Sequence, residues 1–169
     1  MRAVIFGNSG SGKSTLAKAI GEVSNSDILD LDTVAWAAAA PPVRRPLTDS
    51  QELMREFMQS TEDWVIEGCY GDLIEFAMTQ ATHAVFLNPG VATCIDNARN
   101  RPWEPHKYES REAQDANLAM LTAWIDDYVH RGDEFSLRRH QSLFDGFAGH
   151  KREVTTNERD SWLSLFVKA

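Results

Sequence analysis

The sequence predicts an α/β fold, a three-layer sandwich with a parallel sheet of five strands and a short helical lid. Two observations lead to this prediction. Short apolar runs alternate with helical patterns, as in proteins that cover both faces of a parallel sheet with helices. A Gly- and Ser-rich segment, residues 7–14, stands between the first apolar run and the first helix, and such sheets bind ligands beyond the carboxyl ends of their strands.

The strands are expected where the apolar runs stand. The first run ends at Gly7, the second at two aspartates, the third at Glu67 and Gly68, and the fourth at Asn88. Glycine and polar residues therefore gather at the carboxyl edge of the predicted sheet. The expected strands cover residues 3–6, 28–31, 64–66, 83–87 and 152–156.

Helices are expected between and after these strands. Thr48 with Gln51 has the pattern of a capping box, and Gly132 is expected to end a long helix that starts at Ser110. The segment 33–47 is expected to be irregular, because it contains three prolines. The expected helices cover residues 13–24, 48–61, 71–80, 91–100, 110–131 and 133–144, with a final helix capped by Asn157.

Length and composition indicate one domain, residues 1–169, with an ordinary hydrophobic core. Hydrophobic residues make up 43% of the chain, and 17 Lys and Arg against 25 Asp and Glu give a net charge of −8. This balance disfavours binding to nucleic acid or to anionic lipid. No apolar run is long enough for a signal peptide or a membrane span, and the two cysteines form no metal or redox motif. We therefore expect a cytoplasmic protein.

The Gly- and Ser-rich segment carries the most specific motif in the chain. Residues 7–14 match G-x-x-x-x-G-K-[ST] at every specified position. Glycines let consecutive N–H groups wrap around a phosphate, and the helix N-terminus adds its positive end. We expect ATP here, with Lys13 on the β- and γ-phosphates and the Ser14 hydroxyl on Mg²⁺. The expected nucleotide-binding residues are Gly7, Asn8, Ser9, Gly10, Ser11, Gly12, Lys13, Ser14 and Thr15.

Two aspartates follow the second strand. Asp30 and Asp32 are two positions apart, so in an extended strand both side chains point to the same side and can face the crevice over the glycine-rich loop, where we expect them to contact the acceptor. We expect one carboxylate to hold Mg²⁺ through water and the other to accept the proton of an attacking hydroxyl. Asp30 is assigned to the metal and Asp32 to the proton, although either could be the base. Alternatively, the pair caps a helix or lies in a loop.

These features resemble the small P-loop kinases of the adenylate kinase and shikimate kinase type. The chain is most similar to the adenylate-kinase-related topology modulation proteins, which share Leu31–Asp32 followed by Trp36, and an acidic-Gly-x-Tyr run that here covers residues 67–70. The resemblance implies a nucleotide-kinase fold and phosphoryl transfer to a small acceptor. Asn88 departs from it, since related proteins often carry Asp there. The negative charge that Mg²⁺ needs must then come from Asp30 or Asp32; otherwise the protein binds nucleotide but turns it over slowly.

The acceptor is expected to bind along the segment 33–62. Arg44 and Arg45 lie there, where the resemblance places the second substrate, although both could be solvated loop charges. Gly68 would let the acceptor approach the backbone. Shikimate itself is disfavoured, because no Phe-Arg-x-x-Glu segment lies between Pro46 and Trp64, and the turn after the third strand is not Gly-Gly-Gly.

A lid is expected over residues 99–112. Arg99 and Arg101 flank the end of a helix there, and a polar, Pro-containing segment follows. The resemblance implies that such arginines neutralise the transferring phosphoryl group after closure has excluded water. Arg138, on a later helix, is a further candidate for contact with the nucleotide. For all three arginines the alternative is a solvated helix face or helix end.

The sequence thus predicts a kinase that uses ATP and Mg²⁺ to phosphorylate a hydroxyl or a phosphate of a small acceptor, such as a nucleoside, a nucleotide or another metabolite. Its expected catalytic residues are Lys13, Asp32, Arg99 and Arg101. The alternative is a nucleotide-binding switch, or a weak ATPase, with a macromolecular partner. A kinase of nucleic-acid 5′ ends is disfavoured by the net charge.

Overall fold

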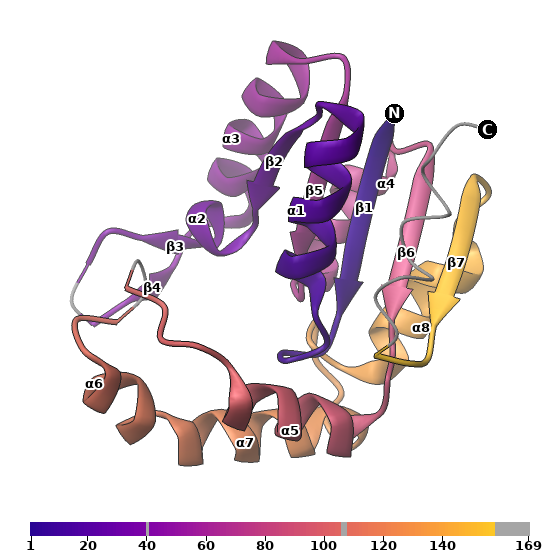
Figure 1. Ribbon diagram of the computed structural model, residues 1–169. Helices are drawn as coiled ribbons and strands as arrows, with labels where there is room; N and C mark the ends of the chain where they lie inside the picture. Colours follow the sequence, from indigo (N-terminus) through magenta and orange to yellow (C-terminus); the bar gives the residue numbers. More distant parts are fainter. Residues whose placement is uncertain (40, 106–107, 158–169) are drawn as a thin grey trace.

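A computed structural model describes residues 1–39, 41–105 and 108–157 (Figure 1). Five strands form one sheet in which every neighbouring pair is parallel. Their order across the sheet is β2 (Asp27–Asp30), β5 (Trp64–Gly68), β1 (Arg2–Gly7), β6 (His83–Leu87) and β7 (His150–Val154). The predicted α/β fold with a parallel five-stranded sheet is confirmed.

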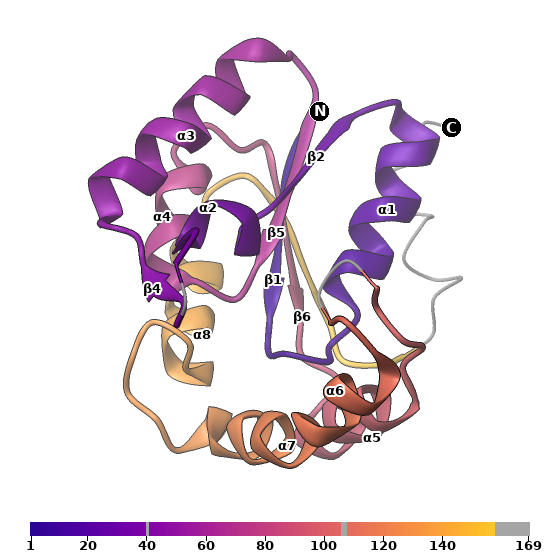
Figure 2. The ribbon, with the colours of Figure 1, turned by 90° about the vertical axis from the view of Figure 1, so that its left-hand side faces the viewer.

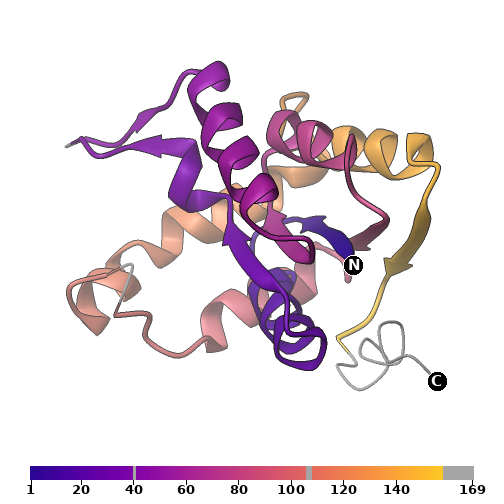
Figure 3. The ribbon, with the colours of Figure 1, turned by 90° about the horizontal axis from the view of Figure 1, so that it is seen from above.

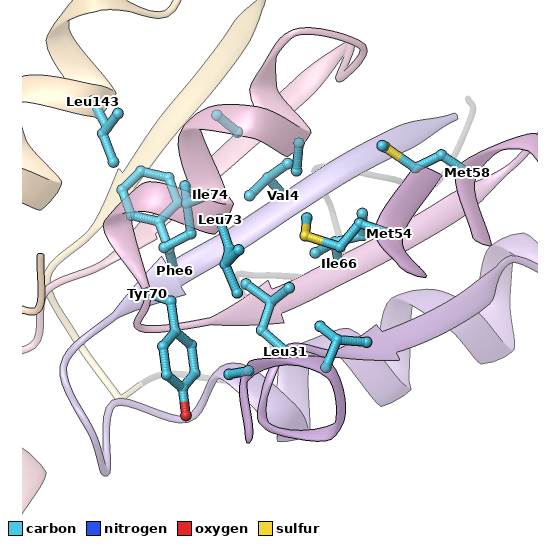
Figure 4. Packing of buried hydrophobic residues seen from close by; sticks show 14 of the residues in the cluster. Val4, Phe6, Leu31, Met54, Met58, Ile66, Tyr70, Leu73, Ile74 and Leu143 are labelled. Atoms are coloured by element: carbon cyan, nitrogen blue, oxygen red, sulfur yellow. The ribbon is translucent and has the colours of Figure 1, made fainter. Parts of the chain in front are cut away.

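Helices cover both faces of the sheet, as Figure 2 shows with the sheet nearly edge-on. Helix α1 (Lys13–Ser24) packs on one face through Leu16, Ala17 and Ile20. The other face carries the larger cluster of buried side chains, part of which is seen in Figure 4. The helices over that face are α3 (Leu47–Ser60), α4 (Gly71–Met78) and α8 (Leu137–Gly146). Because the middle strands β1, β5 and β6 are buried on both sides, they contain the continuous apolar runs 3–6, 64–66 and 84–87.

A further group of helices lies beyond the carboxyl ends of the strands (Figure 1). It consists of α5 (Val91–Asn100), α6 (Arg111–Ala116), α7 (Leu118–Asp126) and the short 3₁₀ turn η1 (Asp127–Val129). Helices α5 and α7 pack together through the buried side chains Cys94, Ala98 and Ile125. This packing places α5 and α7 beside the glycine-rich segment that follows β1.

The predicted long helix over residues 110–131 is wrong, because it is interrupted at Asn117, which ends α6 and precedes α7. Ser110 does cap α6, since its hydroxyl accepts from the N–H of Ala113 at 3.1 Å. The capping box at Thr48 is also wrong: α3 begins one residue earlier, directly after Pro46, and has no side-chain cap. Proline there fixes the backbone in place of a capping hydrogen bond.

The segment 33–47 is more ordered than its prolines suggest. It contains the one-turn helix α2 (Asp32–Ala35) and the antiparallel pair β3 (Trp36–Ala37) and β4 (Val43–Arg44). Seen from above in Figure 3, this hairpin projects away from the sheet. Helix α8 begins at Leu137 instead of 133, because Ser136 caps it through the N–H of Arg139. The predicted final helix after Asn157 lies outside the described residues.

Candidate functional site

A cavity of about 450 Å³ opens at the carboxyl edge of the sheet, where the glycine-rich segment, the ends of β2 and β5, and the lid segment meet. Its described lining is made of the following residues: Ser9, Gly10, Gly12, Lys13, Ser14, Thr15, Asp30, Asp32, Glu67, Gly68, Cys69, Asn97, Ala98, Asn100, Arg101, Pro102, Glu104, Tyr108, Leu121 and Asn157. The cavity therefore brings together the predicted loop, both predicted aspartates, and one of the two predicted lid arginines.

The glycine-rich segment, residues 7–14, forms a tight loop in which all three glycines have positive φ, and two of them also lie against neighbouring backbone. Gly7 and Gly10 have φ of 147° and 75°. A Cβ at Gly7 would lie 2.2 Å from the carbonyl oxygen of Leu87, and one at Gly10 would lie 2.3 Å from that of Cys94. The loop is therefore packed directly against the backbone of β6 and α5. Gly7, Asn8 and Ser11 form its buried base, and the other predicted residues of the loop line the cavity.

Three hydrogen bonds hold this loop in shape. Lys13 Nζ donates to the carbonyl oxygen of Asn8 at 2.8 Å. Asn8 Nδ2 donates to the carbonyl of Ile125 on α7 at 3.0 Å, and Asn97 Nδ2 donates to the carbonyl of Gly10 at 2.8 Å. The loop is thus fixed by its own lysine and by two later helices before any ligand binds.

Three carboxylates lie beside the loop, at the ends of β2 and β5. Asp30 and Glu67 are register partners in neighbouring strands, and Asp32 follows two residues after Asp30. The prediction that Asp30 and Asp32 share one face of an extended strand is wrong, because β2 ends at Asp30 and Asp32 begins α2. Both still line the cavity, since the turn brings the N–H of Asp32 to Asp30 Oδ1 at 2.9 Å.

Asp32 is positioned by two aromatic side chains. The Tyr70 hydroxyl donates to Asp32 Oδ1 at 2.6 Å, and Trp36 Nε1 donates to the same hydroxyl at 2.7 Å. Burial, with the charge of Asp32 next, raises the pKa of Tyr70 well above its ordinary value, so the hydroxyl keeps the proton that it donates. The Arg44 guanidinium lies 4.7 Å from the centre of the Tyr70 ring. A chain of contacts therefore runs from the β3–β4 hairpin to the Asp32 carboxylate.

Glu67, to which the sequence pattern assigns no role, also lines the cavity. Its side chain is only 4% exposed at the end of β5. Its pKa lies above the ordinary value, mainly because the side chain is buried, and the charges of Asp30 and Asp32 act in the same direction. The charge of Lys13 and a hydrogen bond with Ser14 lower the pKa but do not outweigh burial. The position of Glu67 in the sequence, at the end of an apolar strand and directly before a glycine, is the pattern that could have indicated a site residue. Asn97 and Tyr108 gave no comparable signal.

Gly68 lines the cavity as predicted, and its lack of a side chain has a further reason. A Cβ at Gly68 would lie 2.8 Å from Cβ of Leu31, which is fully buried. Next to it, the carbonyl of Cys69 lies 3.0 Å from His140 Nε2. The strand end is therefore fixed by packing as well as by the sheet.

The two lid arginines lie in different surroundings. Arg101 lines the cavity, forms an ion pair with Glu104 at 3.1 Å, and lies 5.7 Å from the centre of the Tyr108 ring. The Arg99 side chain is 61% exposed, does not line the cavity, and faces Asp96 at 3.8 Å. Only Arg101 is brought to the loop. Of the predicted lid, residues 106–107 lie outside the described part.

The remaining predicted arginines do not line this cavity. Arg44 makes a two-pronged contact with Asp72, at 3.0 Å to each carboxylate oxygen. Arg45 donates to the backbone carbonyls of Val34 and Trp36, at 3.1 Å each. Both hold the hairpin in place. Arg138 lines a separate shallow depression beside α8, so the structure does not bring it to the loop.

Within residues 1–39, 41–105 and 108–157, no group of three or more His, Cys, Asp or Glu side chains is arranged to hold a metal ion. A magnesium ion would thus need oxygens from a bound phosphate in addition to Ser14 and the carboxylates. The described helices also include none that is long and apolar enough to cross a membrane.

The sequence matches the AAA domain family AAA_18 over residues 4–117. No protein of the curated set matches it. Among solved structures, deoxyadenosine kinase from M. mycoides with bound dATP has a TM-score of 0.53 at 12% identity, over 98% of this chain and 96% of that one. A sugar kinase from Janibacter sp. has a TM-score of 0.54 at 10% identity, over 96% of this chain and 90% of that one. Shikimate kinase from Acinetobacter baumannii in complex with shikimate has a TM-score of 0.51 at 14% identity, over 98% of this chain and 90% of that one.

At these identities the solved structures are similar to this chain in fold. Together with the family match, they confirm the resemblance to small P-loop kinases and the predicted α/β architecture. The names of the three kinases point to different substrates, so these comparisons indicate no particular ligand for this chain.

Proposed function

The chain belongs to the AAA domain family AAA_18, and from that premise we propose that it is an ATP-dependent kinase. It transfers the γ-phosphoryl group of ATP–Mg²⁺ to a hydroxyl or a phosphate of a small acceptor. The observation that carries this proposal is the cavity itself, which places a phosphate-binding loop and three carboxylates around one space. Carboxylates beside such a loop serve Mg²⁺ in kinases and in nucleotide switches alike, so it is the additional carboxylate of Asp32, oriented by Tyr70, that favours a kinase.

The loop supplies the donor side of the reaction. Its N–H groups and the start of α1 bind the phosphates, and Lys13 neutralises the β- and γ-phosphates. The lysine already lies over the loop, since its ammonium donates to the carbonyl of Asn8. When phosphate binds, the ammonium exchanges this carbonyl for a charged partner, which makes a stronger hydrogen bond.

Mg²⁺ fits the oxygen donors beside the loop. Ser14, Asp30 and Glu67 offer a hydroxyl and carboxylates, the ligands that this hard cation prefers, and the nucleotide phosphates complete its shell. When bound, the ion would neutralise charge on the phosphates. The Ser14 hydroxyl, which hydrogen-bonds Glu67, would turn towards the metal.

Asp32 serves the acceptor side. Its carboxylate orients the acceptor hydroxyl and takes its proton as the hydroxyl oxygen forms a bond to the γ-phosphorus. The bond from that phosphorus to the bridging oxygen breaks, and ADP leaves. Tyr70 holds one carboxylate oxygen of Asp32, so the carboxylate plane is set before the acceptor arrives.

Arg101 closes the donor side. Its guanidinium lines the cavity and is held by Glu104, and we propose that closure of the lid carries it to the transferring group. Arg99 has no such part in the proposal, because its side chain is exposed and directed to Asp96.

The kinase function is tested by supplying ATP–Mg²⁺ with a panel of small hydroxyl compounds and measuring both ADP release and label transferred from the γ-position. A kinase releases ADP faster with its acceptor and transfers the label to it. Steady hydrolysis that no acceptor stimulates would contradict the proposal and favour a nucleotide-dependent switch or weak ATPase. The variant Lys18→Ala, exposed on the same helix as Lys13, serves as the control.

A further inference from the structure

We propose that Gln114 is a positioning residue of the lid, which holds the segment that carries Arg101 so that the guanidinium is ready for the transferring phosphoryl group. The inference rests on the proposed kinase function and deepens it, because it names the residue that sets Arg101. It comes from a buried amide side chain whose two ends both bind the backbone of the lid.

Gln114 is the buried residue of helix α6. It is 5% exposed, whereas the five other residues of that helix are exposed. Burying an amide costs free energy unless its polar atoms find hydrogen-bond partners. Gln114 Nε2 donates to the carbonyl of Pro102 at 3.1 Å, and Gln114 Oε1 accepts from the N–H of Glu104 at 2.9 Å. Both ends of the amide are therefore engaged with the segment 102–104.

The backbone beside Arg101 is constrained from two directions. Proline restricts the residue before it to an extended conformation, and Arg101, which precedes Pro102, has φ of −69° and ψ of 144°. Pro102 and Pro105 also hinder a regular helix here, so the carbonyl and N–H groups of the segment need partners elsewhere. Gln114 provides one partner of each kind, since an amide both donates and accepts.

The contacts of the Arg101 guanidinium depend on the same anchoring. Arg101 Nη1 lies 3.1 Å from Glu104 Oε2, and the backbone N–H of Glu104 is the one that Gln114 binds. At the end of α6, Asn117 Nδ2 donates to the Tyr108 hydroxyl at 3.0 Å, and this hydroxyl accepts from Arg101 Nη2 at 3.4 Å. The guanidinium thus lies between Glu104 and Tyr108, and side chains of α6 and its cap hold both of them.

A guanidinium that is held in advance does not have to be ordered during the reaction, and this lowers the entropic part of the barrier. Gln114 is not among the described residues that line the cavity, whereas Arg101 is. Gln114 therefore acts on the transfer through Arg101. Its loss should cost at most what Arg101 contributes.

The test uses Gln114→Met, which keeps an unbranched side chain of similar length and removes both hydrogen bonds. ATP–Mg²⁺ labelled at the γ-position is supplied with adenosine, AMP, glucose or glycerol, and calorimetry gives ATP affinity. We expect kcat to fall about fivefold and ATP affinity to stay within about twofold of normal, because the guanidinium acts on the transferring group and the loop binds the nucleotide. Gln141→Met is the matched control: it loses a hydrogen bond to Asp145 on α8, and its kcat should be unchanged.

A double variant separates positioning from a general loss of lid structure. Gln114→Met should slow Arg101→Ala by less than about twofold further, because the group that Gln114 positions is already absent. A structural role independent of Arg101 would multiply the two losses. If circular dichroism shows that Gln114→Met is not folded, Gln114→Asn carries the same comparison, since its amide is one carbon shorter and cannot reach both backbone groups.

The outcomes separate the two proposals. A kcat for Gln114→Met equal to that of Gln141→Met overturns the positioning role and leaves the kinase function standing. Multiplied losses in the double variant, or a larger fall in Gln114→Met than in Arg101→Ala, overturn it as well. If the unmodified protein binds ATP and transfers label to none of the four compounds, the kinase function is contradicted, and the role of Gln114 with it.

Discussion

The two sides of the cavity are built in different ways. On the donor side, the loop is one continuous segment, and its buried Asn8 and Lys13 are held by backbone carbonyls. On the acceptor side, Asp32 and Trp36 are exposed, and Asp32 is oriented by Tyr70, which comes from a distant part of the chain. The donor side is therefore formed by a backbone loop that is fixed in place. The acceptor side is formed by side chains whose orientation depends on the position of the β3–β4 hairpin.

This difference has a functional meaning. A nucleotide triphosphate is the same donor in every turnover, so a rigid loop suits it. In the proposed kinase both substrates enter and leave in each turnover, but only the acceptor lies against Asp32, whose orientation depends on the hairpin through Tyr70 and Trp36. Substitutions on the donor side should therefore remove nucleotide binding and transfer together, whereas those on the acceptor side should separate the two.

The largest effect is expected from Lys13→Ala. Phosphoryl transfer should fall by about a thousandfold and ATP should bind more weakly, since the β- and γ-phosphates lose the cation of the loop. Calorimetry gives the affinity, and label transfer gives the rate. Equal affinity and rate in this variant and the unmodified protein would contradict the donor assignment.

Asp32→Asn should lower transfer by about a hundredfold while ATP affinity stays close to normal. The substitution keeps the size of the side chain and removes the proton acceptor. If ATP affinity falls together with transfer, and a higher Mg²⁺ concentration restores both, Asp32 binds the metal instead of the acceptor. If neither quantity changes, the acceptor side has been assigned to the wrong residue.

Arg101→Ala is expected to slow transfer by about tenfold, less than a fully buried donor would, because the guanidinium is partly exposed and shared with Glu104. Arg99→Ala is the matched control on the same lid and should change the rate by less than about twofold, as its contact with Asp96 is exposed. Equal losses in the two variants would show that the lid acts as a general positive surface.

Apart from the control variants, the smallest effect on rate is expected from Tyr70→Phe, a fall of a few-fold in kcat. The ring contacts with Arg44 and Phe135 remain, and only the hydrogen bonds to Asp32 and from Trp36 are lost. The free energy of unfolding should fall by about 1 kcal/mol. Tyr128→Phe removes a buried hydroxyl contact with His140 outside the cavity lining. It should cost similar stability with kcat unchanged.

The same contrast explains what could be predicted from the sequence. The strands, the glycine-rich loop and helices α1 and α5 follow from local patterns, because continuous apolar runs and helix spacing are properties of neighbouring residues. The loop residues Ser9 to Thr15 reach the cavity by chain continuity alone. The interruption at Asn117 was missed, since the apolar spacing continues through it.

The acceptor side was predicted less well, because its contacts join distant segments. Nothing local in the sequence pairs Tyr70 with Asp32 or Arg44 with Asp72, which are 38 and 28 positions apart. Local patterns therefore assign Arg44 and Arg45 to a ligand, whereas Arg44 pairs with Asp72 and Arg45 donates to backbone carbonyls of the hairpin. Glu67 could not be assigned from the sequence either, although it stands out as a charged residue at a strand end. Its burial beside Lys13 depends on the order of the strands in the sheet, which no local pattern gives.

The central place of β1 has a consequence for synthesis of the chain. Strand β1 is made before its partners: among the described strands it pairs only with β5 and β6, and these end at residues 68 and 87. Until then, the apolar face that includes Val4 and Phe6 stays without its partners, and β pairing over such separations is slow. We expect nascent chains that end before residue 87 to be cleaved readily by protease and to engage chaperones, and longer ones to gain protection abruptly.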